Sequence, residues 1–350
     1  MLNSILKYAQ ENECSDIHLV ANMPPIVRHV GDLVRLNMPT LTNEDVYEII
    51  KHFLTPPQKE YFDSGNDVDT SYTDESGNRY RLNIFRQRDS FAIVMRLLKN
   101  KIPTIDELNL PPILKTLALE PRGLILVTGP TGSGKSTTLA AMIDYVNQNK
   151  SKHILTLEDP IEYIHTSKKS LVNQREIHRD SLDFHSSLRS ALREDPDVIL
   201  VGEMRDHESI SLAVTAAETG HLVFSTLHTT GAANTVDRII DAFPPHQQSQ
   251  IRSQLSSVLK GVVSQALLPR IDKTGRIAVH EIMLMTDAIG NLIRENKIVQ
   301  INTAIQTGLR TGMQTFEGNL ARLVLDNIIS YDAANEISSN PELLKRFLGR

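Results

Sequence analysis

The 350-residue sequence predicts an α/β protein, in which a smaller α+β domain precedes a larger core of parallel strands and helices. Three observations predict this class. Four short apolar runs alternate with helical periodicity in the later part of the chain, as strands buried on both faces of a parallel sheet do. A glycine-rich loop joins the first of these runs to a helical segment. Earlier in the chain, short strand-like runs are separated by turn residues.

The N-terminal region combines both types of element. Turn residues at 74–78 separate the two middle strands of this region. Three prolines follow within residues 99–112, which we interpret as a linker, so the first domain is expected at 1–98. Its predicted strands are 26–30, 68–72, 79–85 and 91–97, and its predicted helices are 2–11 and 43–54.

The core domain is expected at residues 113–350. Its apolar runs at 124–128, 153–157, 198–201 and 222–225 predict parallel strands. Apolar side chains recur at helical spacing within 184–192, 210–217 and 251–266, which predicts three covering helices and a three-layer arrangement. From about residue 286 no strand is evident, and Phe316, Leu320, Leu323 and Val324 form a helical stripe. A small helical subdomain is therefore expected at the end of the chain.

The glycine-rich loop has the pattern Gly129-x4-Gly134-Lys135-Ser136, between an apolar strand and a helix. Glycines let backbone N–H groups turn around a phosphate, and the helix N-terminus adds partial positive charge. Lys135 supplies a cation for the phosphates, and the Ser136 hydroxyl can ligate Mg²⁺. The pattern therefore predicts an ATP site. Its expected binding residues are Thr131, Gly132, Ser133, Gly134, Lys135, Ser136 and Thr137.

Acidic side chains follow two of the predicted strands, at the ends where ligands collect in open α/β sheets. Glu203 follows the strand at 198–201, where an acid that supports the magnesium site is expected. After the strand at 153–157 three acids compete for a catalytic role: Glu158, Asp159 and Glu162.

The strand at 222–225 carries a histidine near each end. His228, with Thr226, Thr229 and Thr230, is a candidate for sensing the γ-phosphate by hydrogen bonding, whereas the residues leave the role of His221 open.

The composition excludes several classes of site and partner. The formal net charge of −5 and the aromatic content of 5% do not favour a nucleic-acid partner. Cys14 is the only cysteine, which excludes an intramolecular disulfide and a cysteine-rich zinc site. The N-terminus lacks the features of a signal peptide, and the run at 124–127 is too short to span a bilayer. We therefore expect a cytoplasmic protein without direct membrane insertion.

The motifs together resemble the secretion and pilus ATPases: the phosphate loop, the acidic box at 157–162, the segment 197–206 ending Val-Gly-Glu-Met-Arg-Asp, and the histidine box at 220–231. Ser15-Asp16-Ile17-His18-Leu19, Arg79-Tyr80-Arg81-Leu82-Asn83 and Ala304-Ile305-Gln306-Thr307-Gly308 are similar to the PilT-type retraction ATPases of type IV pili. The resemblance extends through nearly the whole chain.

The resemblance implies a homohexameric ring of subunits, each with a PAS-like N-terminal domain and a RecA-like ATPase domain. Glu162 would be the general base, Glu203 would support Mg²⁺ and His228 would contact the γ-phosphate. Arg81, Arg86, Arg88 and Arg96 are candidates to approach the phosphates, although each is equally suited to pairing with a carboxylate. The ring would drive pilus retraction and twitching motility from the cytoplasmic face of the membrane, against a platform protein in that membrane.

One position departs from the family's pattern. Retraction ATPases typically carry Ala-Ile-Arg-Asn-Leu-Ile-Arg-Glu, whereas this chain has Gly290 in place of the first arginine. In the family this motif is linked to retraction rather than to hydrolysis, so the change bears on the retraction assignment and not on the ATPase assignment.

The alternatives are a pilus-extension or type II secretion ATPase, whose four-cysteine insertion this chain lacks, and a nucleic-acid translocase, which the charge disfavours. A GTPase switch lacks its Asn-Lys-x-Asp sequence here, and a scaffold without turnover does not explain the intact loop.

Overall fold

The computed structural model describes residues 1–98, 101–204 and 206–349. They form two compact units. The first unit contains Met1–Lys101, Glu158–Ile164 and Arg175–Asp183, and the second contains Ile102–Leu157, His165–Gln174 and Phe184–Arg350. Two short segments from the middle of the sequence thus cluster with the N-terminal residues. Residues 99 and 100 of the predicted linker lie outside the described residues.

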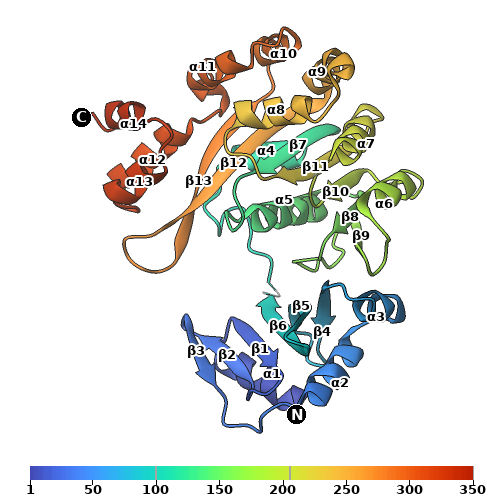
Figure 1. The fold of residues 1–350 in the computed structure, drawn as a ribbon. Coiled ribbons are helices and arrows are strands. Elements are labelled where there is room, and N and C mark those ends of the chain that lie inside the picture. The colour runs from blue at the N-terminus through green and yellow to red at the C-terminus, as the bar shows by residue number, and fades with distance from the viewer. Residues whose placement is uncertain (99–100, 205, 350) are drawn as a thin grey trace. The chain divides into compact units, whose positions relative to one another are not determined.

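The first unit contains a six-stranded antiparallel sheet in the order β3-β2-β1-β6-β5-β4 (Figure 1). Its central strands β1, β5 and β6 supply Ile17, Leu82, Ile84 and Met95 to a buried core. The strands are β1 (Asp16–Val20), β2 (Ile26–His29), β3 (Asp32–Arg35), β4 (Val68–Thr73), β5 (Arg79–Gln87) and β6 (Ser90–Leu98), and the helices are α1 (Leu2–Glu11), α2 (Asn43–Phe53) and α3 (Pro56–Asp63).

Local sequence explains where the helices of this unit begin. The side chains of Thr42 and Asp45 form a reciprocal capping box at the start of α2. In α3 a proline occupies the first helical position, where its missing N–H group costs nothing. Helix α2 then buries Val46, Ile50 and Phe53 in the core of the first unit, so its amphipathic face holds it in place.

The second unit contains a seven-stranded mixed sheet in the order β13-β12-β7-β11-β10-β8-β9. Strands β12, β7, β11, β10 and β8 pair in parallel, and β13 joins β12 in antiparallel orientation. The strands are β7 (Gly123–Thr128), β8 (His153–Glu158), β9 (Leu171–Glu176), β10 (Val198–Val201), β11 (Leu222–Leu227), β12 (Leu259–Pro269) and β13 (Arg276–Leu284).

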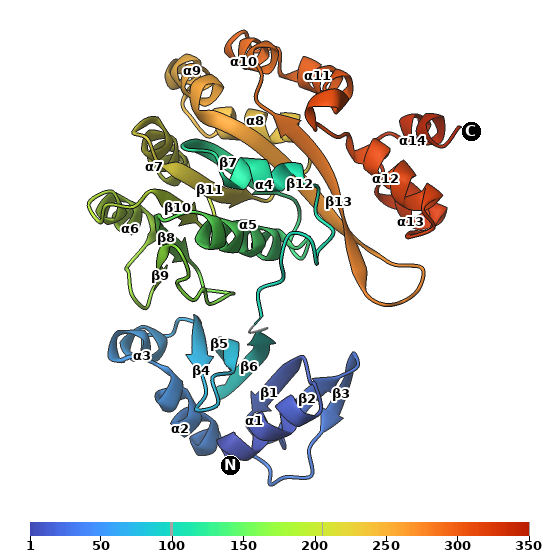
Figure 2. The same cartoon turned by 180° about the vertical axis from the view of Figure 1, so that it is seen from behind.

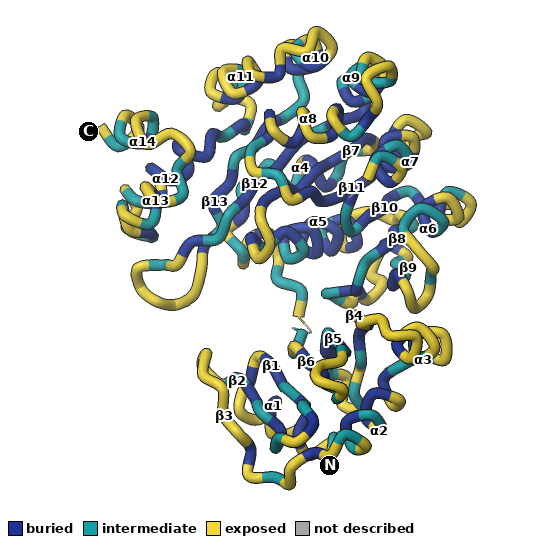
Figure 3. The backbone as a smooth tube through the Cα atoms, in the orientation of Figure 1, coloured by how far each residue is buried: buried dark blue, intermediate teal, exposed yellow. Residues whose placement is uncertain are grey.

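Helices cover both faces of this sheet (Figures 1 and 2). Leu124 and Leu126 of β7 pack in the cluster that includes α7 to α9, whereas Ile125 and Val127 pack in the cluster with α4 and α5. Strands β7, β10 and β11 are consequently buried along their whole length, as Figure 3 shows. The covering helices are α4 (Ile113–Ala118), α5 (Lys135–Asn149), α6 (Phe184–Ala191), α7 (His207–Glu218), α8 (Ala232–Asp241) and α9 (Gln248–Val258).

The continuous helix predicted at 251–266 is wrong in its second half. Helix α9 ends at Val258, and β12 begins at Leu259 and runs between β7 and β13. Val262 and Val263 are β-branched and fill the two opposite faces of the sheet, so both are buried although they are adjacent. Pairing with two neighbouring strands therefore overrides a spacing that also fits a helix.

The C-terminal part of the chain is helical. Among the described residues no strand follows Leu284, as predicted. Phe316, Leu320 and Leu323 pack against Ile277 and Val279 of the β12–β13 hairpin. None of the helices in the described part of the chain combines the length and apolar composition of a membrane span. The longer helices here are α10 (Asp287–Arg294), α11 (Ile301–Thr307), α12 (Phe316–Leu325), α13 (Tyr331–Ile337) and α14 (Pro341–Phe347).

Candidate functional site

Three predicted site segments lie at one edge of the second unit's sheet. Strands β7, β11 and β10 are adjacent and parallel, and their registers pair Thr128 with Leu227 and Val201 with Ser225. The phosphate loop, the segment around Glu203 and the segment around His228 each follow one of these strands, so they emerge side by side. This is the edge at which ligands bind in open α/β sheets.

The phosphate loop depends on glycine at both of its ends. Gly129 has φ +140°, and a Cβ placed there would lie 2.2 Å from the carbonyl oxygen of Gln265. Gly134 has φ +88° and is the N-cap of α5. An L side chain rarely adopts either conformation, so the loop requires glycine at both positions.

The predicted binding residues 131–137 form this loop and the first turn of α5. The ammonium of Lys135 donates to the carbonyl oxygens of Gly129 and Pro130, at 2.8 and 3.0 Å, so it lies across the loop. The buried hydroxyl of Ser133 has no hydrogen-bond partner among the described residues. Because α5 has 15 residues, its N-terminus presents N–H groups and partial positive charge at the loop.

Gln265 stabilises the phosphate loop through hydrogen bonds. The sequence alone does not identify it. This side chain of β12 is buried; its Nε2 donates to the Ser133 carbonyl at 2.6 Å, and its Oε1 accepts from the Thr138 hydroxyl at 2.9 Å. It thereby joins the loop to the first turns of α5. Gln265 lies more than a hundred residues after the loop, and it falls in the segment predicted as a helix, so no local signal marks it.

Glu203 and His228 are in contact, with 3.2 Å between Oε1 of the carboxylate and Nε2 of the imidazole. Two backbone hydrogen bonds hold the segment that carries Glu203: Gly202 N–H donates to the Leu157 carbonyl, and Met204 N–H donates to that of Thr226. A carboxylate and an imidazole thus meet at the strand ends beside the phosphate loop. Arg205, the next residue of the predicted motif, lies outside the described residues.

Two of the three hydroxyls predicted to act with His228, those of Thr226 and Thr229, form hydrogen bonds within the protein. Thr226 donates to the Gly202 carbonyl at 2.6 Å, and Thr229 shares a hydrogen bond of 2.7 Å with Thr235. At the opposite end of β11, Nδ1 of His221 lies 2.9 Å from the carbonyl oxygen of Ala216. Of the two histidines, only His228 lies at the carboxyl edge of the sheet.

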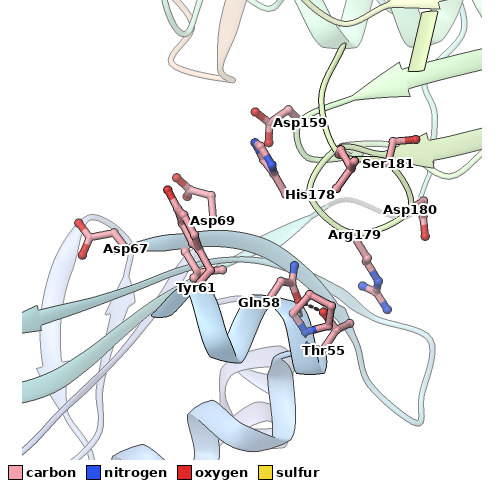
Figure 4. A pocket seen from close by; sticks show the side chains of 13 residues that line it. Thr55, Gln58, Tyr61, Asp67, Asp69, Asp159, His178, Arg179, Asp180 and Ser181 are labelled. Carbon is pink, nitrogen blue, oxygen red and sulfur yellow. Dashed lines mark hydrogen bonds between the residues drawn. The ribbon is translucent and has the colours of Figure 1, made fainter. Parts of the chain in front are cut away.

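The acidic residues of the acidic box lie in the segment Glu158–Ile164, which belongs to the first unit. The carboxylate of Glu162 is partly exposed, and its Oε1 lies 4.0 Å from Nη1 of Arg81 on β5. Asp159 instead lines a pocket of about 560 Å³ in this unit. Figure 4 shows Asp159 and His178 on one side of the pocket, with Tyr61 and Asp69 on the other. Glu162 is thus paired with Arg81, one of the candidate arginines.

The remaining candidate arginines differ in their surroundings. Arg96 donates from Nε to Asp16 at 2.9 Å, and this hydrogen bond and charge help to hold the pKa of Asp16 below its usual value, against the opposing effect of burial. Arg86 stacks over the ring of Phe62 and lies 4.0 Å from Asp63. Arg88 is exposed in the turn between β5 and β6. Arg86 and Arg96 therefore pair with carboxylates of the first unit, as the alternative interpretation expects.

Comparison with known proteins adds to this geometry. A family model described as Type II/IV secretion system protein matches residues 81–329. The type IV pilus retraction ATPase PilT of Pseudomonas aeruginosa is 50% identical over 341 residues, which cover 97% of this chain and 99% of that protein. A twitching motility protein of Neisseria gonorrhoeae is 49% identical and covers 97% of this chain, while 91% of its own length is covered. The crystal structure of the pilus retraction motor PilT with bound ADP is similar with a TM-score of 0.91, at 47% identity and 98% coverage of both chains.

Proposed function

Because the chain belongs to the Type II/IV secretion system protein family, and within it to the PilT-type pilus retraction ATPases, we propose that it is an ATP-hydrolysing motor that powers retraction of type IV pili. The observation that carries the proposal is the row of functional groups at the ends of β7, β11 and β10. A phosphate loop, an imidazole and a carboxylate lie there on adjacent parallel strands.

In the proposed reaction the loop binds the triphosphate of ATP. Lys135 and the N-terminus of α5 offset the negative charge of the phosphates, and His228 donates a hydrogen bond to the γ-phosphate. Glu162 is the general base that orients the attacking water and accepts its proton. Arg81 is the best placed of the candidate arginines to stabilise the charge that develops, because it already lies near Glu162.

The residues present suit a magnesium ion as cofactor. Mg²⁺ prefers oxygen ligands, and the Ser136 hydroxyl and the Glu203 carboxylate offer such oxygens. Ser136 would ligate the ion directly and Glu203 would hold its water shell. When bound, the ion would neutralise charge on the phosphates. Glu203 also orients His228 through the contact of 3.2 Å, whichever ion is bound.

The assembly and location of the motor belong to the same proposal. Residues 1–98 would be a PAS-like domain, 99–112 a linker and 113–350 a RecA-like ATPase domain with a helical subdomain from about 286. Six copies would form a ring at the cytoplasmic face of the membrane and would act on a platform protein there, without binding nucleic acid. The similarity to PilT over nearly the whole length supports this arrangement.

Turnover measurements on three variants test the chemistry. We expect Lys135→Ala to lose nucleotide binding or turnover. Glu162→Gln and Glu203→Gln should still bind ATP but lose most hydrolysis, by roughly a hundredfold for the general base. Lys152→Ala is the matched control, since Lys152 pairs with Asp197 at the amino end of β10, away from the loop. Normal turnover in either glutamine variant would remove that carboxylate from its role.

Deletion in the source organism tests the biological role. Loss of a retraction motor should leave excess surface pili and abolish twitching motility. Cells without pili would instead indicate a pilus-extension motor, and unchanged pili would leave only the ATPase activity.

A further inference from the structure

Glu176 gathers hydrogen bonds from two separate segments of the first unit. It ends β9 and is only 3% exposed. Its Oε2 accepts from the Ser71 hydroxyl of β4 at 2.8 Å and from the Ile161 N–H of the acidic box at 3.2 Å. Glu176 therefore ties the acidic box to the antiparallel sheet.

Arg79 of β5 completes this arrangement. Its Nη2 lies 3.5 Å from the same Oε2 of Glu176 and donates to the Ser71 hydroxyl at 2.9 Å. Its Nη1 donates to the Ile161 carbonyl at 2.8 Å. The N–H and C=O groups of Ile161 are thus both held by one buried ion pair. Arg179, labelled in Figure 4, adds a hydrogen bond of 3.0 Å to the Ser71 carbonyl.

Ile161 directly precedes Glu162, so the ion pair determines the backbone position from which the Glu162 side chain extends. Arg79 and Arg81 are two residues apart on β5 and point to the same face of the sheet. Arg79 holds the backbone of Ile161, and Arg81 lies 4.0 Å from the carboxylate of Glu162. One strand therefore contacts two successive residues of the acidic box.

We propose that Glu176 and Arg79 are positioning residues that hold the general base Glu162 in its reactive orientation. The inference rests on the proposed function, which makes Glu162 the base. Stability alone is a weak explanation for such a pair, because the desolvation of two buried charges offsets most of their attraction. Burial lowers the pKa of Arg79, opposed by the charges of Glu176 and Glu158, but a guanidinium remains protonated at neutral pH.

The expected effect is a loss of kcat without a change in substrate binding. Displacing a catalytic group by about 1 Å can lower a rate by about a hundredfold. We expect kcat for ATP hydrolysis to fall by about 30- to 100-fold in Glu176→Ala, while KM stays within about twofold. Glu176→Gln keeps an oxygen that can accept from Ile161 N–H but loses its charge opposite Arg79, so an intermediate kcat is expected.

Gln58→Ala is the matched control for folding. Gln58 is buried, and it donates to the Thr70 hydroxyl at 3.1 Å, one residue before Ser71 on β4. Its loss should lower the melting temperature by an amount similar to that of Glu176→Ala, but kcat should stay within about twofold of the wild type. An equal loss of kcat in the control would overturn the positioning role, because general destabilisation would then explain both variants.

Combination with Glu162→Gln separates the inference from the function on which it rests. If Glu176 acts through Glu162, Glu176→Ala should cause little further loss of kcat in the Glu162→Gln background. Normal turnover in Glu162→Gln would overturn the general base and, with it, this inference. Lost turnover in Glu162→Gln together with wild-type kcat in Glu176→Ala would overturn the positioning role alone.

Discussion

Replacement of Gln265 by methionine should weaken nucleotide binding by about 10- to 100-fold. Methionine has nearly the same length and can fill the buried site, but it cannot replace the hydrogen bonds to the Ser133 carbonyl and the Thr138 hydroxyl. Each buried group left without a partner costs roughly 1–3 kcal/mol. Loss of the hydrogen bond to the Ser133 carbonyl should change the conformation of the phosphate loop. Nucleotide binding would then have to return the loop to its binding conformation, which costs affinity.

The size of the effect follows from this cost. A tenfold change in affinity corresponds to about 1.4 kcal/mol, so a loss of roughly 1–3 kcal/mol at Ser133 weakens binding by about one to two orders of magnitude. The dissociation constant is measured by titration with a fluorescent ADP analogue, and the melting temperature is measured without nucleotide. The loss at Thr138 should appear mainly in the melting temperature.

Asn319→Leu controls for general destabilisation. Asn319 is also a buried polar residue of the second unit, and its Oδ1 accepts from His280 N–H at 2.8 Å on β13 rather than from the phosphate loop. Both variants should melt at a lower temperature, but only the Gln265 variant should lose affinity. Wild-type affinity in Gln265→Met, with melting lowered as in the control, would refute the idea that Gln265 shapes the loop.

Two further predictions concern stability. Burial lowers the pKa of His280 to about 4, so the unfolded chain, with the ordinary value of 6.5, takes up the proton first. Acid should therefore destabilise the wild type by roughly 3 kcal/mol between pH 6.5 and 4 through this residue, and urea unfolding of His280→Leu should show a shallower pH dependence. An unchanged dependence, equal to that of the exposed control His246→Leu, would contradict this. Gly290→Ala should raise the free energy of unfolding by about 0.5–1 kcal/mol, because the nearest atoms to an added Cβ are 3.5 Å away; a lower urea midpoint would contradict it.

The central strands could be predicted from sequence because they are buried on both faces. The apolar runs predicted at 124–128, 153–157, 198–201 and 222–225 lie within β7, β8, β10 and β11. The predicted helices at 2–11 and 43–54 match α1 and α2 to within one residue. In these segments the local pattern and the tertiary environment favour the same structure.

Strands β3, β9 and β12 could not be predicted in this way. All four residues of β3 are exposed, and β9 begins with Leu171 and Val172 but continues with four polar residues, so neither forms a buried apolar run. The sequence predicts a helix in the region of β12 because Leu259, Val262 and Ala266 also fit a helical spacing. Its strand conformation depends on pairing with β7, whose sequence lies more than a hundred residues earlier.

The same division applies to the candidate site. The phosphate loop, Glu203 and His228 each follow a predicted strand, and parallel strands bring such segments to one edge, so they could be found from sequence. Gln265 contacts Ser133 and Glu176 contacts Ser71, each more than a hundred positions away in the sequence, and neither Gln265 nor Glu176 belongs to a recognisable motif. Residues that support a site through such distant contacts therefore cannot be identified from sequence motifs, although they help to determine the geometry of the site.

The choice among the three acids of the acidic box illustrates how these supporting contacts matter. Sequence spacing alone treats Glu158, Asp159 and Glu162 alike. In the structure Asp159 lines the pocket of about 560 Å³ in the first unit. Glu162 instead follows a residue whose backbone is held on both sides by Arg79 and Glu176, and its carboxylate faces Arg81. Under the proposed function, the fixed backbone beside Glu162 is the feature that matters, because a general base must be held at a defined position to orient the attacking water.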